Sequence, residues 1–130
     1  LASLVNKCDC FVMPSYGEAW CIPALESMAL GLPVIYTSET GMDDFCVGWP
    51  VQSRSSRCYL ANDSLDDVYT SLTSWREVDI EALASTMRIA YETHKNNTQE
   101  WDKITALAKD KARDYSPKNI GNKMKELLNG

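Results

Sequence analysis

The segment from Asp9 to Ile35, DCFVMPSYGEAWCIPALESMALGLPVI, constrains the fold of this chain more than any other part. It opens with a short continuous apolar run, Cys10 to Met13, which is typical of a strand buried on both faces. The residues that follow, from Pro14 to Gly17, are rich in turn formers and end this strand. A second apolar run from Pro33 to Tyr36 predicts another strand, so a connection must join the two.

A helix is predicted between these two runs. Pro23 suits the first turn of a helix, and apolar residues then recur with helical spacing, namely Ala24, Leu25, Met28 and Ala29. Gly31 predicts the C-terminal cap, and Pro33 cannot continue the helix. A strand-helix-strand unit with such short turns forms a parallel, right-handed crossover. The sequence therefore predicts an α/β fold with a partial Rossmann-like parallel sheet.

Two carboxylates lie within this unit, Glu18 in the loop after the first strand and Glu26 about one turn into the helix. Ligands bind at the carboxyl ends of parallel strands, and helix N-terminal amides favour a phosphate. Carboxylates accept hydrogen bonds from hydroxyls. A phosphate site flanked by carboxylates suits a nucleotide sugar. The alternative is that both glutamates only complement the helix dipole, which contributes about 0.3–1 kcal/mol each.

The rest of the chain changes character along its length. Two short edge strands are predicted, Trp49 to Val51 and Cys58 to Leu60, with the polar run SRSSR as a loop between them. From Ser64 onward the sequence predicts helices. The first ends near Thr73, and the later ones begin after Asp79, after Asn97 and after Ser116. We expect one partial domain over residues 1–130, with a strand-loop-helix region at 1–61 and a helical C-terminal region at 62–130.

Composition narrows the function classes. The net charge of -5 argues against a nucleic-acid surface, and no apolar run approaches the roughly 20 residues of a membrane-spanning helix. The five cysteines lack the spacing of a zinc site, so no zinc site is expected. Reduced thiols fit a cytoplasmic protein. The opening LASLVNKC has the pattern of the end of a helix, so we expect the chain to be part of a longer protein.

These residues resemble the C-terminal half of a GT-B fold glycosyltransferase, most closely glycosyltransferase family 4 (group 1). The matching features are FVMPS at Phe11 to Ser15, the two glutamates with seven residues between them, SMALGLPVI at Ser27 to Ile35, and a turn at Thr40-Gly41. The C-terminal YSPKNIGNKMKELL is similar to the closing helix of that family. The resemblance thus implies that residues 1–61 form the donor-binding region of a nucleotide-sugar-binding domain.

The resemblance also implies roles for individual residues. Glu26 would hold the ribose hydroxyls, and Glu18 would lie at the transferred sugar as the catalytic residue. The remaining donor-binding residues would be Ser15, Ala19, Trp20, Cys21 and Ile22, and the possible donor loop Thr40 and Gly41. Two departures stand out. The family usually has glycine, an aromatic and glycine where this chain has Ala19, Trp20 and Cys21, and a Gly-Gly pair where it has Thr40-Gly41.

By this resemblance, the chain would take part in moving a sugar from a nucleotide diphosphate sugar to an acceptor, with retention of configuration and without a metal or other cofactor. Its partners would be the nucleotide sugar and a missing N-terminal acceptor domain of the same protein. The isolated fragment would be inactive, and the full-length protein would be cytoplasmic or peripheral to a membrane. Two alternatives stay open: a degenerate, non-catalytic GT-B binding module, and a GT-B fold epimerase acting on a nucleotide sugar. For Trp20, covering the sugar and plugging the domain cleft are equally open.

Overall fold

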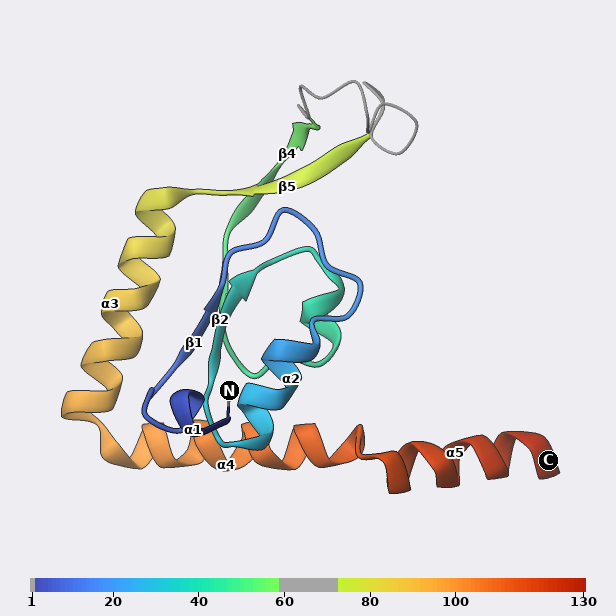
Figure 1. Cartoon of the computed structure of the whole chain (residues 1–130). Helices are drawn as coiled ribbons and strands as arrows, with labels where there is room; N and C mark the ends of the chain where they lie inside the picture. The colour runs from blue at the N-terminus through green and yellow to red at the C-terminus, as the bar shows by residue number, and fades with distance from the viewer. Residues whose placement is uncertain (1, 59–72) are drawn as a thin grey trace.

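The structure is a computed structural model that describes residues 2–58 and 73–130 (Figure 1). The predicted strand residues 59–60 and nearly all of the helix predicted from Ser64 to Thr73 lie outside the described residues. The elements, in chain order, are α1 (Ala2–Val5), β1 (Phe11–Met13), α2 (Ile22–Ala29), β2 (Val34–Thr37), the 3-10 helix η1 (Gly41–Asp44), β3 (Gly48–Val51), β4 (Ser53–Arg57), β5 (Ser74–Val78), α3 (Ile80–Asn96), α4 (Thr98–Asp114) and α5 (Pro117–Asn129).

The first sheet is parallel, in the order β1-β2-β3. Phe11 aligns with Val34, and Val34 aligns with Gly48. The strand-helix-strand unit predicted from the sequence is therefore present, and the partial Rossmann-like α/β fold is confirmed. The predicted strand at Trp49 to Val51 is also confirmed as β3, at one edge of this sheet.

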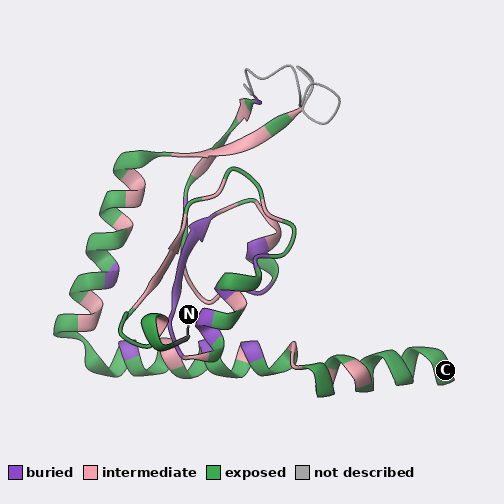
Figure 2. Cartoon of the chain, viewed as in Figure 1, coloured by how far each residue is buried: buried purple, intermediate pink, exposed green. Residues whose placement is uncertain are grey.

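The core divides between the two faces of β2, because successive strand residues point to opposite faces. Val34 and Tyr36 pack with Met28 of α2, whereas Ile35 packs with Val51 and with Ala90 of α3. The central strand is buried along its whole length (Figure 2). The sheet thus lies between α2 on one face and α3 on the other.

The prediction that the first strand is buried on both faces is wrong. All three residues of β1 are only half-buried. The reason is position, since β1 lies at an edge of the described sheet with β2 as its neighbour. The apolar run that suggests a central strand therefore belongs to an edge strand.

The turn after α2 has the predicted cap. Gly31 adopts a φ of 93°, and its N–H donates to the carbonyl of Met28 over 2.9 Å. The next amide, that of Leu32, donates to the carbonyl of Ser27 over 3.0 Å. This pair of bonds is the Schellman motif, which satisfies the last carbonyls of the helix and needs a left-handed residue. It turns the chain directly into β2.

A second sheet corrects two predictions. The run SRSSR is strand β4, not a loop, and it pairs antiparallel with β5 within the region predicted to be helical. Cys58, the one described residue of the other predicted edge strand, lies just after β4 and outside any strand. Strands β4 and β5 carry polar residues on both faces. They therefore lack the apolar alternation that marks a half-buried strand. Figure 1 shows this β4–β5 hairpin rising away from the parallel sheet.

The last three helices begin at the predicted caps. The Asp79 carboxylate accepts from the amide of Ala82 over 2.9 Å, and the side chains of Asn97 and Ser116 cap α4 and α5 in the same way. Helix α4 packs against α2, and α5 continues outward from it (Figure 1). Within the described residues, no helix has the length and apolar character needed to cross a bilayer.

Candidate functional site

The loops that follow β1 and β2 meet at the carboxyl edge of the sheet. The amide of Gly41 donates to the carbonyl oxygen of Glu18 over 2.8 Å. A Cβ at Gly41 would overlap the backbone of Ala19 and would lie 2.8 Å from the carbonyl oxygen of Glu18. Only glycine permits this approach, so the structure brings the predicted turn at Thr40-Gly41 against the loop that carries Glu18.

A pocket of about 270 Å³ opens at this junction. Its first wall comes from the two loops and consists of Tyr16, Gly17, Glu18, Glu39 and Thr40. Its second wall comes from the β4–β5 hairpin and consists of Ser55, Ser74, Trp75 and Arg76. Glu18 is half-buried there. The sequence does not predict the hairpin wall, because β4 and β5 lack an apolar alternation and no motif marks their residues.

Ser15 contributes a buried polar atom beside these loops. Its hydroxyl oxygen is buried and has no hydrogen-bond partner among the described residues. Its carbonyl accepts from the hydroxyl of Thr37, at the end of β2, over 2.7 Å. Ser15 itself does not belong to the lining of the Glu18 pocket.

The N-terminus of α2 has no side-chain cap. The N-cap residue is Cys21, and its side chain accepts no hydrogen bond from the helix amides. The thiol is 2% exposed and packs with Ala24 and Phe45. Burial raises the pKa of the Cys21 thiol, so it stays neutral at physiological pH. The Cys21 side chain is therefore part of the core on this face of the sheet.

Glu26 does not line the pocket that holds Glu18. It is exposed on α2, where it lines a separate groove of about 530 Å³ with mostly apolar neighbours, among them Val5 and Phe11. The structure thus places the two predicted glutamates at different hollows, on either side of the β1–α2 connection. Helix α2 has no acidic residue in its first turn, so Glu26 lies beyond the reach of the dipole effect, which fades within that turn.

Trp20 packs on aromatic rings and does not line the pocket. Its ring centroid lies 4.3 Å from that of Phe45 and 4.7 Å from that of Tyr115, which follows α4. The side chain is 41% exposed. Its neighbours Ala19 and Ile22 are also exposed. This packing joins the loop after β1 to the end of α4, and the two roles left open for Trp20 stay predictions.

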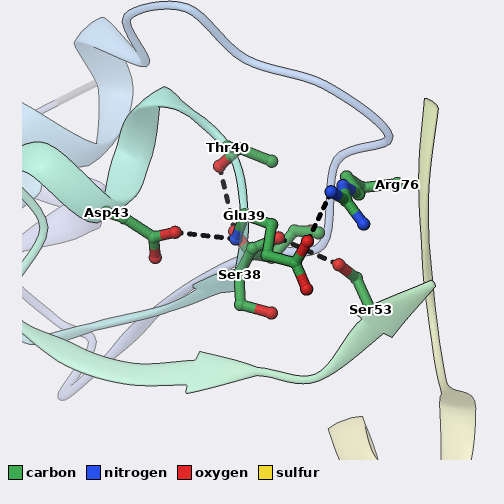
Figure 3. Close-up of polar contacts among 7 residues, drawn as sticks. Ser38, Glu39, Thr40, Asp43, Ser53 and Arg76 are labelled. Carbon is green, nitrogen blue, oxygen red and sulfur yellow. Dashed lines mark hydrogen bonds and ion pairs between the residues drawn. The ribbon is translucent and has the colours of Figure 1, made fainter. Parts of the chain in front are cut away.

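A polar network links the loop after β2 to the hairpin (Figure 3). The Glu39 carboxylate forms an ion pair with Arg76, and the Glu39 amide donates to the Asp43 carboxylate over 2.7 Å. The hydroxyl of Ser53 donates to the carbonyl of Ser38 over 2.9 Å. Within residues 2–58 and 73–130, no group of three or more His, Cys, Asp or Glu side chains is arranged to hold a metal ion.

In a comparison with known protein families, one segment of the chain matches a family model, and this segment contains the predicted site. Residues 1–47 match the family model described as "Glycosyl transferases group 1". No match was found among curated proteins or among solved structures. The matched segment runs from α1 past η1 and contains every site residue predicted from the sequence. This part of the chain is therefore similar to the group 1 glycosyltransferases, and the match supports a transferase that acts on sugars.

Proposed function

We propose that this chain forms the donor-binding part of a retaining glycosyltransferase of GT-B fold, family 4, that uses a nucleotide diphosphate sugar. The observation that carries the proposal is the hydrogen bond from the Gly41 amide to the Glu18 carbonyl. It holds the loop after β1 against the loop after β2, at the edge of a parallel sheet where ligands bind. The 47-residue match to the group 1 family supports the same reading.

The diphosphate would lie at the N-terminus of α2. Free amides at a helix start favour an anion. In the first turn of α2, Pro23 has no N–H and the Ala24 amide donates to the Cys21 carbonyl over 3.1 Å. The Ile22 amide is engaged neither by that bond nor by a side-chain cap. As the sugar leaves, negative charge grows on the diphosphate, and amides already oriented toward that position stabilise it. The backbone amides of Ala19, Trp20 and Ile22 are the candidates for this role. As the family resemblance implies, we expect the reaction to need no metal.

The two glutamates would bind different parts of the donor. Glu26, in its groove beside β1, would accept hydrogen bonds from the ribose hydroxyls. Glu18, in the pocket closed by the hairpin, would contact the transferred sugar as the catalytic residue. In the reaction, the bond from the anomeric carbon to the diphosphate breaks and a bond to the acceptor oxygen forms on the same face. The acceptor hydroxyl passes its proton to the departing diphosphate in this step.

Donor binding by the full-length protein tests the proposal. The Glu26→Ala variant should bind a nucleotide diphosphate sugar about 10- to 100-fold more weakly, since hydrogen bonds to charged groups contribute about 1.5–3 kcal/mol. Glu126→Ala, an exposed change on α5, is the control and should bind as the wild type does. Calorimetric titration measures both. Unchanged binding by Glu26→Ala would contradict the assigned role, and turnover of the sugar without any acceptor would indicate an epimerase instead.

A further inference from the structure

The β4–β5 hairpin is fixed against the loop that follows β1. The amide of Arg76 donates to the carbonyl of Tyr16 over 2.7 Å. The rings of Trp75 and Tyr16 stack, with centroids 4.4 Å apart and planes 18° from parallel. A two-stranded hairpin alone is only marginally stable in water. These contacts therefore hold the hairpin at the rim of the Glu18 pocket.

A strained residue joins the hairpin to the loop after β2. Glu39 has a φ of 60°, a left-handed conformation that is unfavourable for a residue with a side chain. Its amide is held by the Asp43 carboxylate, and its own carboxylate reaches Arg76 (Figure 3). Residues in such conformations are found most often at ligand sites, where contacts with the surrounding structure hold them in place.

The size of the pocket indicates what enters it. Its volume of about 270 Å³ lies just below the roughly 300–1,000 Å³ of pockets for drug-sized ligands. One sugar ring suits this space better than a whole nucleotide sugar. The carboxylates of Glu18 and Glu39 accept hydrogen bonds from hydroxyls, whereas the Arg76 guanidinium donates them.

The charges around the pocket indicate the class of sugar. Glu18 and Glu39 bring two negative charges and Arg76 brings one positive charge, which leaves one net negative charge. Because Arg76 is already paired with Glu39, no other cation among the described lining residues is left to neutralise an anionic sugar. A carboxylate on the sugar would therefore meet net repulsion, whereas neutral hydroxyls find both acceptors and donors.

We propose that the β4–β5 hairpin forms one wall of the pocket for the transferred sugar, and that the Arg76–Glu39 pair positions and selects an uncharged monosaccharide. This inference rests on the proposed function, in which Glu18 contacts the sugar of a nucleotide donor. It assigns to the hairpin a role in substrate choice that lies outside the segment matched by the family model.

The contribution of the sugar to binding tests this inference. The full-length protein is titrated with UDP, GDP and ADP and with their glucose conjugates. For the base that binds best, the Kd of the free diphosphate divided by the Kd of its glucose conjugate measures how much the sugar contributes to binding. In Arg76→Ala, the conjugate should bind about tenfold more weakly, while the diphosphate alone binds as before. Arg54→Ala is the matched control, since Arg54 lies on the same hairpin, pairs with Glu77 and is 78% exposed. It should keep the wild-type ratio.

Two further arms separate sugar recognition from a purely structural ion pair. Arg76→Lys keeps the charge but loses the planar fork, so the ratio should fall while the thermal unfolding midpoint stays unchanged. The glucuronate conjugate of the best-bound diphosphate should bind more weakly than the glucose conjugate. A wild-type ratio in both Arg76 variants, or tighter binding of the glucuronate conjugate, would overturn the inference. If the wild-type protein binds none of the conjugates, the proposed function itself fails and this inference fails with it.

Discussion

The backbone amide of Gly41 and the carbonyl oxygen of Glu18 lie 2.8 Å apart and form a hydrogen bond between loops that follow adjacent parallel strands. This bond places the Glu18 carboxylate at the carboxyl edge of the sheet. It requires a residue without a side chain at position 41, because a Cβ would overlap backbone atoms of the facing loop.

Replacing Gly41 with alanine should disrupt this contact. Backbone atoms cannot move aside as cheaply as a flexible side chain, so Gly41→Ala should lower the free energy of unfolding by about 1–3 kcal/mol and weaken donor binding. Gly17→Ala is the matched control, because Gly17 lines the same pocket and a Cβ there meets no atom within 4 Å. Urea unfolding of both variants measures the difference. Equal stability of the two would contradict the packing described for Gly41.

Met28 should be the most sensitive position of α2. Its side chain is fully buried between α2 and the sheet, so Met28→Ala should cost about 2–5 kcal/mol. Met124, on α5, is 57% exposed. Met124→Ala should therefore change the free energy of unfolding by no more than about 0.5 kcal/mol. A similar loss in both variants would show that α5 is covered in solution.

The cap of α3 should contribute measurably to stability. Asp79→Ala removes the carboxylate that accepts from the Ala82 amide, and loss of such a cap costs about 0.5–2 kcal/mol. Asp79→Asn retains an oxygen acceptor at the same place and should lose less. Thermal unfolding of the two variants provides the comparison. If the asparagine variant is the less stable of the two, the side-chain cap is not the source of the effect.

The half-buried thiol of Cys46 should make the fold less stable at high pH. Burial raises the pKa of Cys46 from 9.0 to about 12. Between these values the folded state keeps a proton that the unfolded state loses, so the free energy of unfolding should fall as pH rises from 9 toward 12. Cys46→Ala should make this decline shallower in urea unfolding at a series of pH values. A decline in Cys46→Ala as steep as in the wild type would contradict the assignment.

The sequence was sufficient where local signals act alone. Gly31 marks the end of α2, and the caps at Asp79, Asn97 and Ser116 mark the starts of three helices, because each depends on residues within one turn. The parallel pairing of β1 with β2 also follows from local turns and apolar runs, whereas the parallel pairing of β3 with β2 comes from the structure alone.

Features that depend on distant contacts were not predicted. The hairpin is held by pairing between Ser53–Arg57 and Ser74–Val78 and by the stacking of Trp75 on Tyr16, and neither leaves an apolar alternation in the sequence. The half-burial of β1 depends on its place at the sheet edge. The separation of Glu18 from Glu26 into two hollows likewise depends on how α2 lies against β1. Their roles toward a donor stay predictions.

Sugar transfer by a Glu18→Gln variant of the full-length protein tests the central claim most directly. Glutamine keeps the size and the polarity of the side chain but removes the negative charge that would face the transferred sugar. With a labelled nucleotide sugar and acceptor, we predict that turnover falls by at least about a hundredfold, the scale of losing one electrostatic contact in a transition state, while the free diphosphate binds as before. Wild-type turnover in Glu18→Gln would contradict the assignment of this pocket to the transferred sugar.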